Sequence, residues 1–432
     1  MVLKVDRQLI GIIIFVILIV IIAGVYFIGG SNEQIPSQNV VVDMQEIDNI
    51  DHTNMVDNID IPGLTTVYVA AGGGKEGFLA DQDIHKILIE KYKLNVVYDN
   101  WSNGKLVLWP VVREKIDRGN KSLRNSDNLT IRTEGATPYD AIFPSDQRYY
   151  DYFQLPADKS KNEADRSRVQ GGSLTLNTPI VIYSWDDVTE ALIKENIVTL
   201  RDGTYYITDM PKLMQYMLDK KKWKDIGLDK YYGSVEIKSV DPVVSSPGAT
   251  YYGLLLSIFC EGVVTDESAI QKFPELKDFY SKAGSLMHSP ADLFDAYKFQ
   301  RTPLVVDYEK SIINLAHDEP EYFAQIKDSI RVLYPEPTMW NSHCYEYFTD
   351  EGKQLFEAFK DPEIQKIAWE RYGFRTGVAG GSYDTKQFGI GIPQNITQLV
   401  SGLKMNIYDK LTAYLGEKDE EKAYNILHDI TE

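Results

Sequence analysis

The sequence is poor in cysteine and histidine, with 2 Cys and 6 His among 432 residues. The two cysteines, Cys260 and Cys344, are too few for a disulfide framework or a Cys-based metal site. The histidines are scattered, and no pair of them has the spacing of metal ligands. We therefore expect neither a metal nor any other cofactor.

Familiar catalytic motifs are also lacking. The chain has no Gly-x-Ser-x-Gly turn, which presents a nucleophilic serine in α/β-hydrolases. The loop "AGGSYD" at 379–384 is rich in glycine without that pattern. A Ser/His/Asp triad assembled from distant segments stays open, because such triads are defined by geometry and not by sequence order. Nothing in the sequence indicates one, so we expect a protein that is not an enzyme.

Basic residues are outnumbered, since 45 Lys and Arg stand against 63 Asp and Glu and the formal net charge is -18. Binding to the phosphate backbone of nucleic acid requires basic patches, so this charge argues against nucleic acid as a partner. It does not argue against a small anion, because a local site can be positive within a negative protein.

Charged residues are absent from residues 9–29, and this stretch is long enough to cross the hydrocarbon core of a bilayer. Lys4 and Arg7 precede it, which predicts a cytoplasmic tail at 1–8, a transmembrane anchor at 9–29 and an extracytoplasmic body. A cleaved signal peptide is the alternative. Val25 occupies the position of the lipidated cysteine of a lipoprotein signal, so we favour an uncleaved single-pass anchor.

Residues 30–64 contain seven acidic residues but no Lys, Arg or aromatic residue. Such a segment cannot bury enough apolar surface to order itself, and like charges extend it. We expect an acidic, disordered linker that holds the body away from the membrane.

From residue 65 onward, strand patterns alternate with helix patterns. Strands are expected in "TTVYVAAG", "LNVVYDNW", "YDAIFPSD", "TLNTPIVIYSW", "SVEIKSV", "TPLVVDY" and "IRVLYPEPT", and helices between and after them, including one at 105–119. This alternation predicts an α/β fold with a parallel sheet covered by helices. In such sheets, ligands bind beyond the carboxyl ends of the strands. The candidate binding residues at those ends are Gly73, Gly74, Lys75, Trp101, Ser145, Asp146, Ser245, Ser246, Gly248, Ala249, Thr250 and Tyr308.

The stretch "DPVVSSPGATYYG" at 241–253 begins an apolar helix with two hydroxyls, a proline and a glycine. One interpretation is a helix cap, because Ser is a preferred N-cap and Pro suits the first turn. The other is an anion site, because a helix start offers free N–H groups and Gly248 would let a ligand approach the backbone. The loop Gly72-Gly73-Gly74-Lys75 similarly suits either an anion nest or a flexible turn.

The order of these segments over residues 65–376 resembles that of bacterial extracellular solute-binding proteins with the type-2 periplasmic-binding-protein fold, especially sulfate- and molybdate-binding members. The resemblance rests on "VEIKSVDPVVSSPGATYYGLLL", "LVVDYEKSII", "IRVLYPEPT" and "FEAFKDPEIQKIAWERYGFR". The sequence departs from the family at Gly72-Gly73-Gly74-Lys75, where relatives often carry Ser, and at Pro247, where the sulfate-type turn has Gly. Residues 377–394 have no counterpart that we can assign.

The resemblance implies a two-lobed body, with lobe 1 at 65–182 and 333–432 and lobe 2 at 183–332. "TPIVIYS" and "RVLYPEP" would cross between the lobes, and a small ligand, an oxyanion by analogy, would bind in the cleft. It implies capture of a solute for an ABC permease, and the anchor suits a Gram-positive cell surface. The alternatives are a ligand-sensing receptor or accessory protein without a transport role and, less favoured, an extracytoplasmic enzyme. With the resemblance, the turn at 245–250 is favoured as a ligand site.

Overall fold

The computed structural model describes residues 63–101, 139–148, 169–243, 245–282, 286–287, 289–376, 383–396, 398–400 and 402–428. The expected cytoplasmic tail at 1–8, the anchor at 9–29 and the linker up to residue 62 lie outside these residues, as does the helix expected at 105–119. Within the described ranges, no helix combines the length and apolar character needed to span a bilayer.

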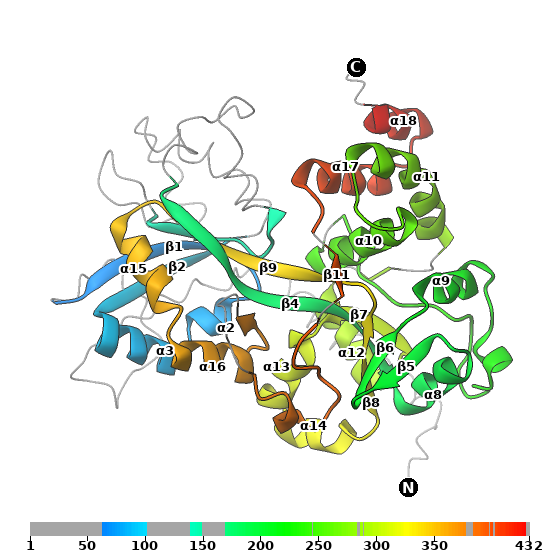
Figure 1. Ribbon diagram of the computed structural model, residues 1–432, viewed down its shortest axis with the longest axis horizontal. Helices are drawn as coiled ribbons and strands as arrows, with labels where there is room; N and C mark the ends of the chain where they lie inside the picture. Colours follow the sequence, from blue (N-terminus) through cyan, green and yellow to red (C-terminus); the bar gives the residue numbers. More distant parts are fainter. Residues whose placement is uncertain are drawn as a thin grey trace, which may run out of the picture. The chain divides into compact units, whose positions relative to one another are not determined.

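The strands alternate with helices along most of the chain (Figure 1). The strands are β1 (Thr65–Gly72), β2 (Leu94–Trp101), β3 (Ala141–Phe143), β4 (Gly171–Trp185), β5 (Val198–Arg201), β6 (Thr204–Ile207), β7 (Leu304–Tyr308), β8 (Ile330–Pro335), β9 (Thr338–Tyr347), β10 (Arg375–Thr376) and β11 (Leu399–Val400). The α-helices are α2 (Glu76–Leu79), α3 (Gln82–Ile87), α8 (Asp186–Lys194), α9 (Met210–Leu218), α10 (Ser246–Phe259), α11 (Asp266–Lys282), α12 (Pro290–Gln300), α13 (Lys310–Asp318), α14 (Pro320–Ile326), α15 (Asp350–Ala358), α16 (Pro362–Glu370), α17 (Met405–Gly416) and α18 (Glu420–His428). Shorter turns are η1 (Leu88–Tyr92), η4 (Trp223–Ile226) and η5 (Lys386–Phe388).

The strands form a mixed sheet in the order β2-β1-β3-β9-β4-β8-β6-β5, with β7 and β10 also paired to β4 and β11 paired to β9. The pairs β1–β2, β1–β3 and β6–β8 are parallel, whereas β4 is antiparallel to β7, β8 and β9. The expected α/β class is therefore confirmed, but the sheet is mixed and not purely parallel.

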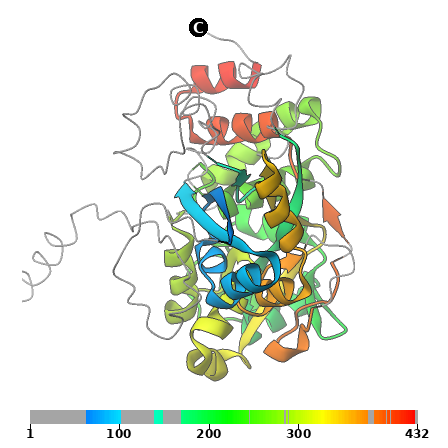
Figure 2. The same cartoon turned by 90° about the vertical axis from the view of Figure 1, so that its left-hand side faces the viewer.

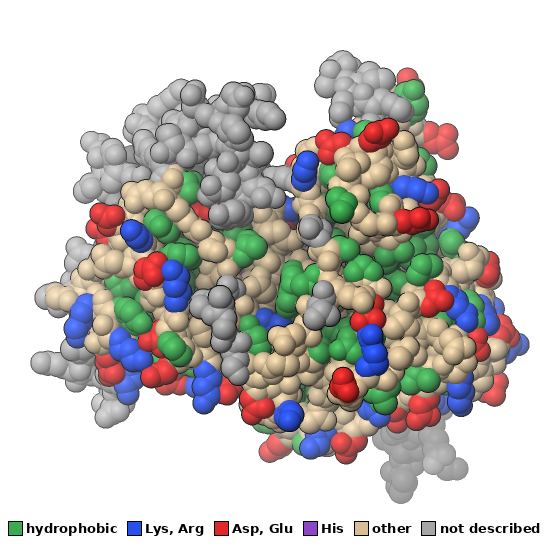
Figure 3. Space-filling model, viewed as in Figure 1, with side chains coloured by type: hydrophobic (Ala, Val, Ile, Leu, Met, Phe, Trp, Pro, Cys, Tyr) green, Lys and Arg blue, Asp and Glu red, His purple; other side chains and the backbone are tan. Residues whose placement is uncertain are grey.

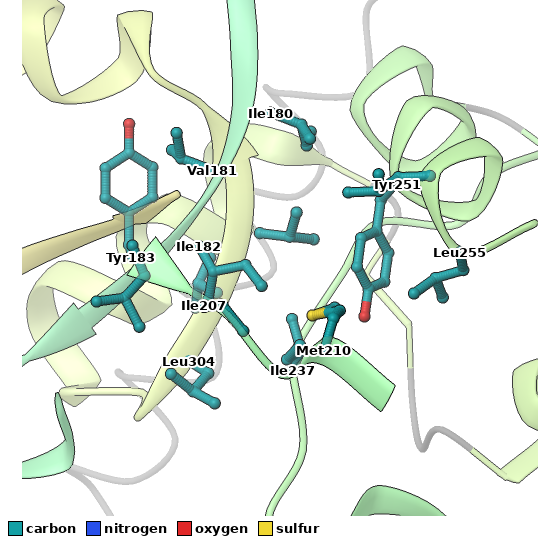
Figure 4. Close-up of a cluster of buried hydrophobic side chains, with 14 of the residues drawn as sticks. Ile180, Val181, Ile182, Tyr183, Ile207, Met210, Ile237, Tyr251, Leu255 and Leu304 are labelled. Carbon is teal, nitrogen blue, oxygen red and sulfur yellow. The ribbon is translucent and has the colours of Figure 1, made fainter. Parts of the chain in front are cut away.

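Two hydrophobic cores lie along this sheet. One packs β1, β2 and β3 with α3, α15 and α16, around residues such as Phe78, Phe143 and Phe359. The other is larger and surrounds the second half of β4, from Ile180 onward, together with α9 and α10 (Figure 4). Strand β4 serves both, because its first half pairs with β9 and its second half pairs with β7 and β8.

The C-terminal helices pack on the larger core. Helix α17 contacts α10 and α11, and α18 packs on α17, as the red helices beside the green ones in Figure 2 show. Tyr408 and Leu411 of α17 are fully buried there. The expected lobe 1 includes these residues, whereas they pack with residues of the expected lobe 2. The lobe boundaries themselves stay a prediction.

The expected strand "SVEIKSV" at 234–240 does not form. Lys238 pairs with Val305 of β7, but two residues later Val240 pairs with Met287 instead. A ladder needs successive pairs with the same partner, so the segment remains extended with single bridges only. The sequence pattern correctly predicted an extended backbone but wrongly predicted that this segment forms a strand of the sheet.

Candidate functional site

A cleft of about 520 Å³ opens where several strand ends and helix starts meet. Three helices contribute their first turns: Ser246 and Pro247 of α10, Pro290 of α12, and Lys310 of α13. The other polar lining residues are Gly73, Gly74, Ser145, Lys298, Asp307, Tyr308, Ser311, Asn314, Asp318, Glu319, Asn341 and His343. Of the candidates from sequence, Gly73, Gly74, Ser145, Ser246 and Tyr308 thus share one cleft.

The glycine loop after β1 meets the start of α13 in this cleft. Gly74 has a φ of +80°, and its carbonyl oxygen accepts a hydrogen bond of 3.1 Å from the Lys310 ammonium group. Burial lowers the pKa of Lys310, while the nearby Asp307 carboxyl acts in the opposite direction. Sequence analysis missed Lys310, although it follows directly after the strand end at Tyr308 and Glu309.

Lys75 does not face the cleft. Its side chain is 1% exposed, donates 2.8 Å to the carbonyl oxygen of Gly72 and lies over the Phe143 ring at 4.9 Å. Burial lowers its pKa to about 7, because an ammonium ion is poorly solvated there. Lys75 is therefore a buried lysine behind the cleft wall and not the exposed cation that the loop sequence indicated.

This pKa yields a pH prediction. Unfolded Lys75 titrates near 10.5, so between pH 7 and 9 the unfolded chain binds more protons at this residue than the folded chain. Stability then rises with pH, by at most about 1.4 kcal/mol per unit from this group. Chemical denaturation of the wild type and of Lys75→Met at pH 7, 8 and 9 should show a steeper rise for the wild type. Parallel pH profiles would contradict the prediction, and the exposed Lys366→Met is the control.

The start of α10 is organised around Asp146 and not around a free anion site. The Ser246 hydroxyl donates 3.3 Å to the Asp146 carboxylate and lies 3.1 Å from the Tyr308 hydroxyl, which lies 3.0 Å from the Thr250 hydroxyl. A carboxylate can only accept hydrogen bonds, so the Ser246 hydroxyl donates to Asp146. The Tyr308 hydroxyl then donates to Ser246, and the Thr250 hydroxyl donates to Tyr308. The three hydroxyl groups therefore form a chain of hydrogen bonds that ends at Asp146, and none of them is available to donate to a solute.

The other residues of this turn serve packing. Gly248 lies against the preceding backbone, since a Cβ there would overlap the Val240 carbonyl oxygen and lie 3.0 Å from the carbonyl carbon of Asp241. Ala249 is buried in the larger core. Ser245 occupies the N-cap position, yet its hydroxyl makes no capping bond and has no partner among the described residues. Neither the cap nor the anion interpretation describes Ser245 fully.

Two residues of β9 that sequence analysis did not select line the cleft. Asn341 and His343 are 2% and 1% exposed, and their side-chain amide and imidazole lie 3.4 Å apart. Burial and the ammonium groups of Lys75 and Lys310 hold the pKa of His343 well below its usual value. Polar residues at alternate positions of a buried strand point to the same side, and that spacing was the available signal.

Each of these side chains has a buried polar atom without a partner among the described residues, Oδ1 of Asn341 and Nδ1 of His343. If the Asn341 amide donates to Nε2 of His343, the imidazole carries its proton on Nδ1. The Asn341 Oδ1 acceptor and the His343 Nδ1–H donor are then unused. The opposite amide orientation also leaves one of each. Both side chains line the cleft, so these atoms are available for hydrogen bonds with a molecule in it.

Asp307, three residues before Lys310, also lines the cleft. Its carboxylate accepts 2.8 Å from the backbone N–H of Tyr308 and 2.7 Å from the Ser311 hydroxyl. Burial raises its pKa to about 6. The Asp307 carboxylate thus already accepts hydrogen bonds from protein groups. Lys310 is the lining side chain that contacts Gly74.

Beneath the cleft, a buried ion pair joins three strands. Arg375 of β10 donates 2.7 Å and 2.8 Å to the two carboxylate oxygens of Glu309, which follows β7. Tyr334 of β8 donates 2.6 Å to the same carboxylate. Both charged side chains are almost fully buried, so this network holds the end of β7, and with it Tyr308 and Lys310, in position.

Trp101, the remaining candidate, ends β2 and pairs through its backbone with Gly72. Its side chain is outside the described part of the chain. Among the described residues, no group of His, Cys, Asp and Glu has the arrangement of a metal site.

No family model and no curated protein sequence matches the chain. Solved structures do. A protein from Bordetella parapertussis described as an extracellular solute-binding protein superposes with a TM-score of 0.51 at 12% identity, covering 83% of this chain and 98% of that one. Apo ferric ion-binding protein A from Pasteurella haemolytica has a TM-score of 0.49 at 11% identity, covering 84% and 97%. The sulfate-binding protein from Mycobacterium tuberculosis has a TM-score of 0.44 at 10% identity, covering 78% and 94%. The chain has the type-2 periplasmic-binding-protein fold, as its segment order predicted.

Proposed function

We propose that the protein is a membrane-anchored, extracytoplasmic solute-binding protein that captures a small solute bearing an oxyanion group for an ABC-type importer. The observation that carries the proposal is the convergence of three helix starts and Lys310 on one cleft. The importer, the anchor at 9–29 and the cell-surface location are part of the proposal and rest on the fold and on the sequence.

The attraction of this cleft for an anion comes from particular groups, Lys310 and the helix starts, because the lining carboxylates outnumber the lining lysines. The N-terminal ends of α10, α12 and α13 each present a partial positive charge, and each contributes about 0.3–1 kcal/mol to an adjacent anion. Lys310 adds a full charge when protonated, and an anion beside it favours that form. On the face seen in Figure 3, acidic and basic side chains are interspersed. The protein has a net charge of -18, so attraction of an anion has to come from local groups such as Lys310 and the helix starts.

These terms are sufficient for useful affinity. Hydrogen bonds to charged groups each contribute roughly 1.5–3 kcal/mol net. Three or four of them, from Lys310, the Gly73–Gly74 backbone and neighbouring polar groups, support micromolar binding, which requires about 8 kcal/mol. The donors differ from those expected at 245–250, because Ser246 and Thr250 already donate to protein partners.

A thermal-shift screen of the intact chain in detergent tests the proposal. The panel includes sulfate, molybdate, phosphate, phosphonates and small carboxylates. A ligand at a hundred times its dissociation constant should stabilise the fold by about 2.7 kcal/mol. If no anion in the panel raises the unfolding midpoint, the proposal is wrong.

Lys310→Met should weaken binding of any anion found in this way. Loss of one charge-assisted hydrogen bond of about 1.5–3 kcal/mol corresponds to roughly 10- to 150-fold in the dissociation constant, measured by calorimetry. Lys366→Met on α16, an exposed lysine outside the cleft, is the matched control. Equal affinities of the two variants would remove Lys310 from the site.

A further inference from the structure

The cleft is much larger than an inorganic oxyanion. At about 30 Å³ per water molecule, a volume of about 520 Å³ equals roughly 17 waters, whereas an oxyanion of five heavy atoms displaces about two or three. Clefts of about 300–1,000 Å³ are typical of sites for organic molecules. A bare sulfate or molybdate would therefore leave most of this space filled only with water.

The residues of α13 that line the cleft have a fixed order of polarity. Lys310, Asn314, Leu315 and Asp318 all line it and follow one another along this helix. With a rise of 1.5 Å per residue, Leu315 lies about 7 Å and Asp318 about 12 Å along the axis from Lys310. The wall thus changes from cationic through apolar to acidic over about two turns.

Helix α12 adds an aromatic surface. Phe294 lines the cleft and is partly exposed, while its ring packs edge-on against Tyr183 at 5.2 Å and tilted against Tyr297 at 5.9 Å. These contacts hold the ring in place. A fixed aromatic ring and the buried Leu315 form an apolar wall that an inorganic anion would not use.

The end of the cleft far from Lys310 is acidic. Lys298 bridges Glu319 and Asp295 at 3.0 Å each, and the Asp318 carboxylate lies 2.8 Å from Nδ1 of His317. Carboxylates outnumber ammonium groups there, so this end does not favour a second anionic group. An apolar body, with polar contacts at the cleft mouth, fits this end.

We propose that the solute is an organic anion, with its oxyanion head at Lys310 and an apolar body extending along α13 between Leu315 and Phe294. This inference rests on the proposed function and specifies the class of solute. Asn341 and His343, which line the same cleft and keep one donor and one acceptor unused, favour a head that carries both kinds of hydrogen-bonding group.

Calorimetric titration of the intact chain with phosphate, methylphosphonate and phenylphosphonate tests the inference. The three share an oxyanion head and differ in the apolar body. Phenylphosphonate should bind at least tenfold more tightly than phosphate, because its ring becomes buried against Phe294 and Leu315. Equal affinity for phosphate and phenylphosphonate would overturn the inference and leave the proposed function intact.

Variants on one helix refine the test. Phe294→Ala should reduce the advantage of phenylphosphonate over phosphate by at least threefold, because the phenyl ring loses its aromatic contact. Phe299→Ala is the matched control, since Phe299 lies on the same helix, is 66% exposed and does not line the cleft. An unchanged ratio in Phe294→Ala would overturn the inference. If Phe294→Ala does not fold, the affinities of the wild type for the three probes decide the test. Failure of all three probes to bind the wild type would also overturn the inference. The proposed function is then judged on the wider anion panel.

Discussion

Arg375→Met is expected to lower the free energy of unfolding by about 3–5 kcal/mol, the usual cost of breaking a buried ion pair. Glu309 is fully buried, and Arg375 supplies both of its side-chain ion-pair contacts. Without Arg375, the carboxylate keeps only the Tyr334 hydroxyl as a side-chain donor among the described residues. Arg375 also donates to the backbone carbonyls of Pro393 and Gln394, so the substitution loosens that segment as well.

Denaturant unfolding followed by circular dichroism measures this effect. The double variant Glu309→Gln/Arg375→Met should be more stable than Arg375→Met alone, because it removes the charge that the single variant leaves unpaired. Arg331→Met is the control, since Arg331 is partly exposed and its side-chain hydrogen bonds go to backbone carbonyls. A loss for Arg375→Met no larger than that of the control would show that the pair contributes little.

Gly248→Ala is expected to lower the free energy of unfolding by about 3 kcal/mol, at the upper end of the cost of overpacking a core. The added methyl group would overlap the carbonyl oxygen of Val240 and crowd Asp241. Backbone atoms cannot rotate away as a flexible side chain can, so the start of α10 would have to shift.

Gly73→Ala is the matched control for this substitution. An added Cβ at Gly73 would meet only the Glu76 carboxylate, at an ordinary 3.6 Å, and the backbone there is not left-handed. Its unfolding free energy should therefore change by less than about 1 kcal/mol, the range seen when Gly→Ala causes no strain. Equal losses for the two variants, compared by thermal unfolding, would contradict the packing role of Gly248.

The packing role of Gly248 also changes how binding at this turn should be tested. A substitution such as Gly248→Asp would disturb the helix start whether or not a solute binds there. Lys310 is the more informative position, because its side chain lines the cleft and its backbone is not crowded by the substitution that we propose.

Much of the fold could be read from local pattern. Strands β1, β2 and β7 and helix α10 form where alternation, apolar periodicity and turn residues predicted them. The segment at 234–240 shows the limit of this reading. Its sequence favours extended backbone, but whether an extended segment becomes a strand depends on partners distant in the sequence, here Val305 and Met287.

The site was predicted in outline. Gly73, Gly74, Ser145, Ser246 and Tyr308 line one cleft, in agreement with the expectation that strand ends converge, and their role in binding stays a prediction. Lys75 was expected to face it and is buried instead, while Lys310, Asn341 and His343 were not selected. Sequence shows that a side chain is polar, but not whether another protein group already uses its donors and acceptors.

The sequence by itself determined the α/β character of the body and the order of its elements, because these follow from local periodicity and from the direction of the chain. The edge of the sheet where a solute would bind stays a prediction. Only the tertiary structure decided which polar groups remain for a solute. All nearby groups compete for hydrogen bonds. Asp146, 100 residues away from Ser246, accepts the hydrogen bond that the Ser246 hydroxyl would otherwise donate to a solute. The same folding brings Lys310 and Gly74 together across 236 residues, at the side of the cleft where we propose that an anion binds.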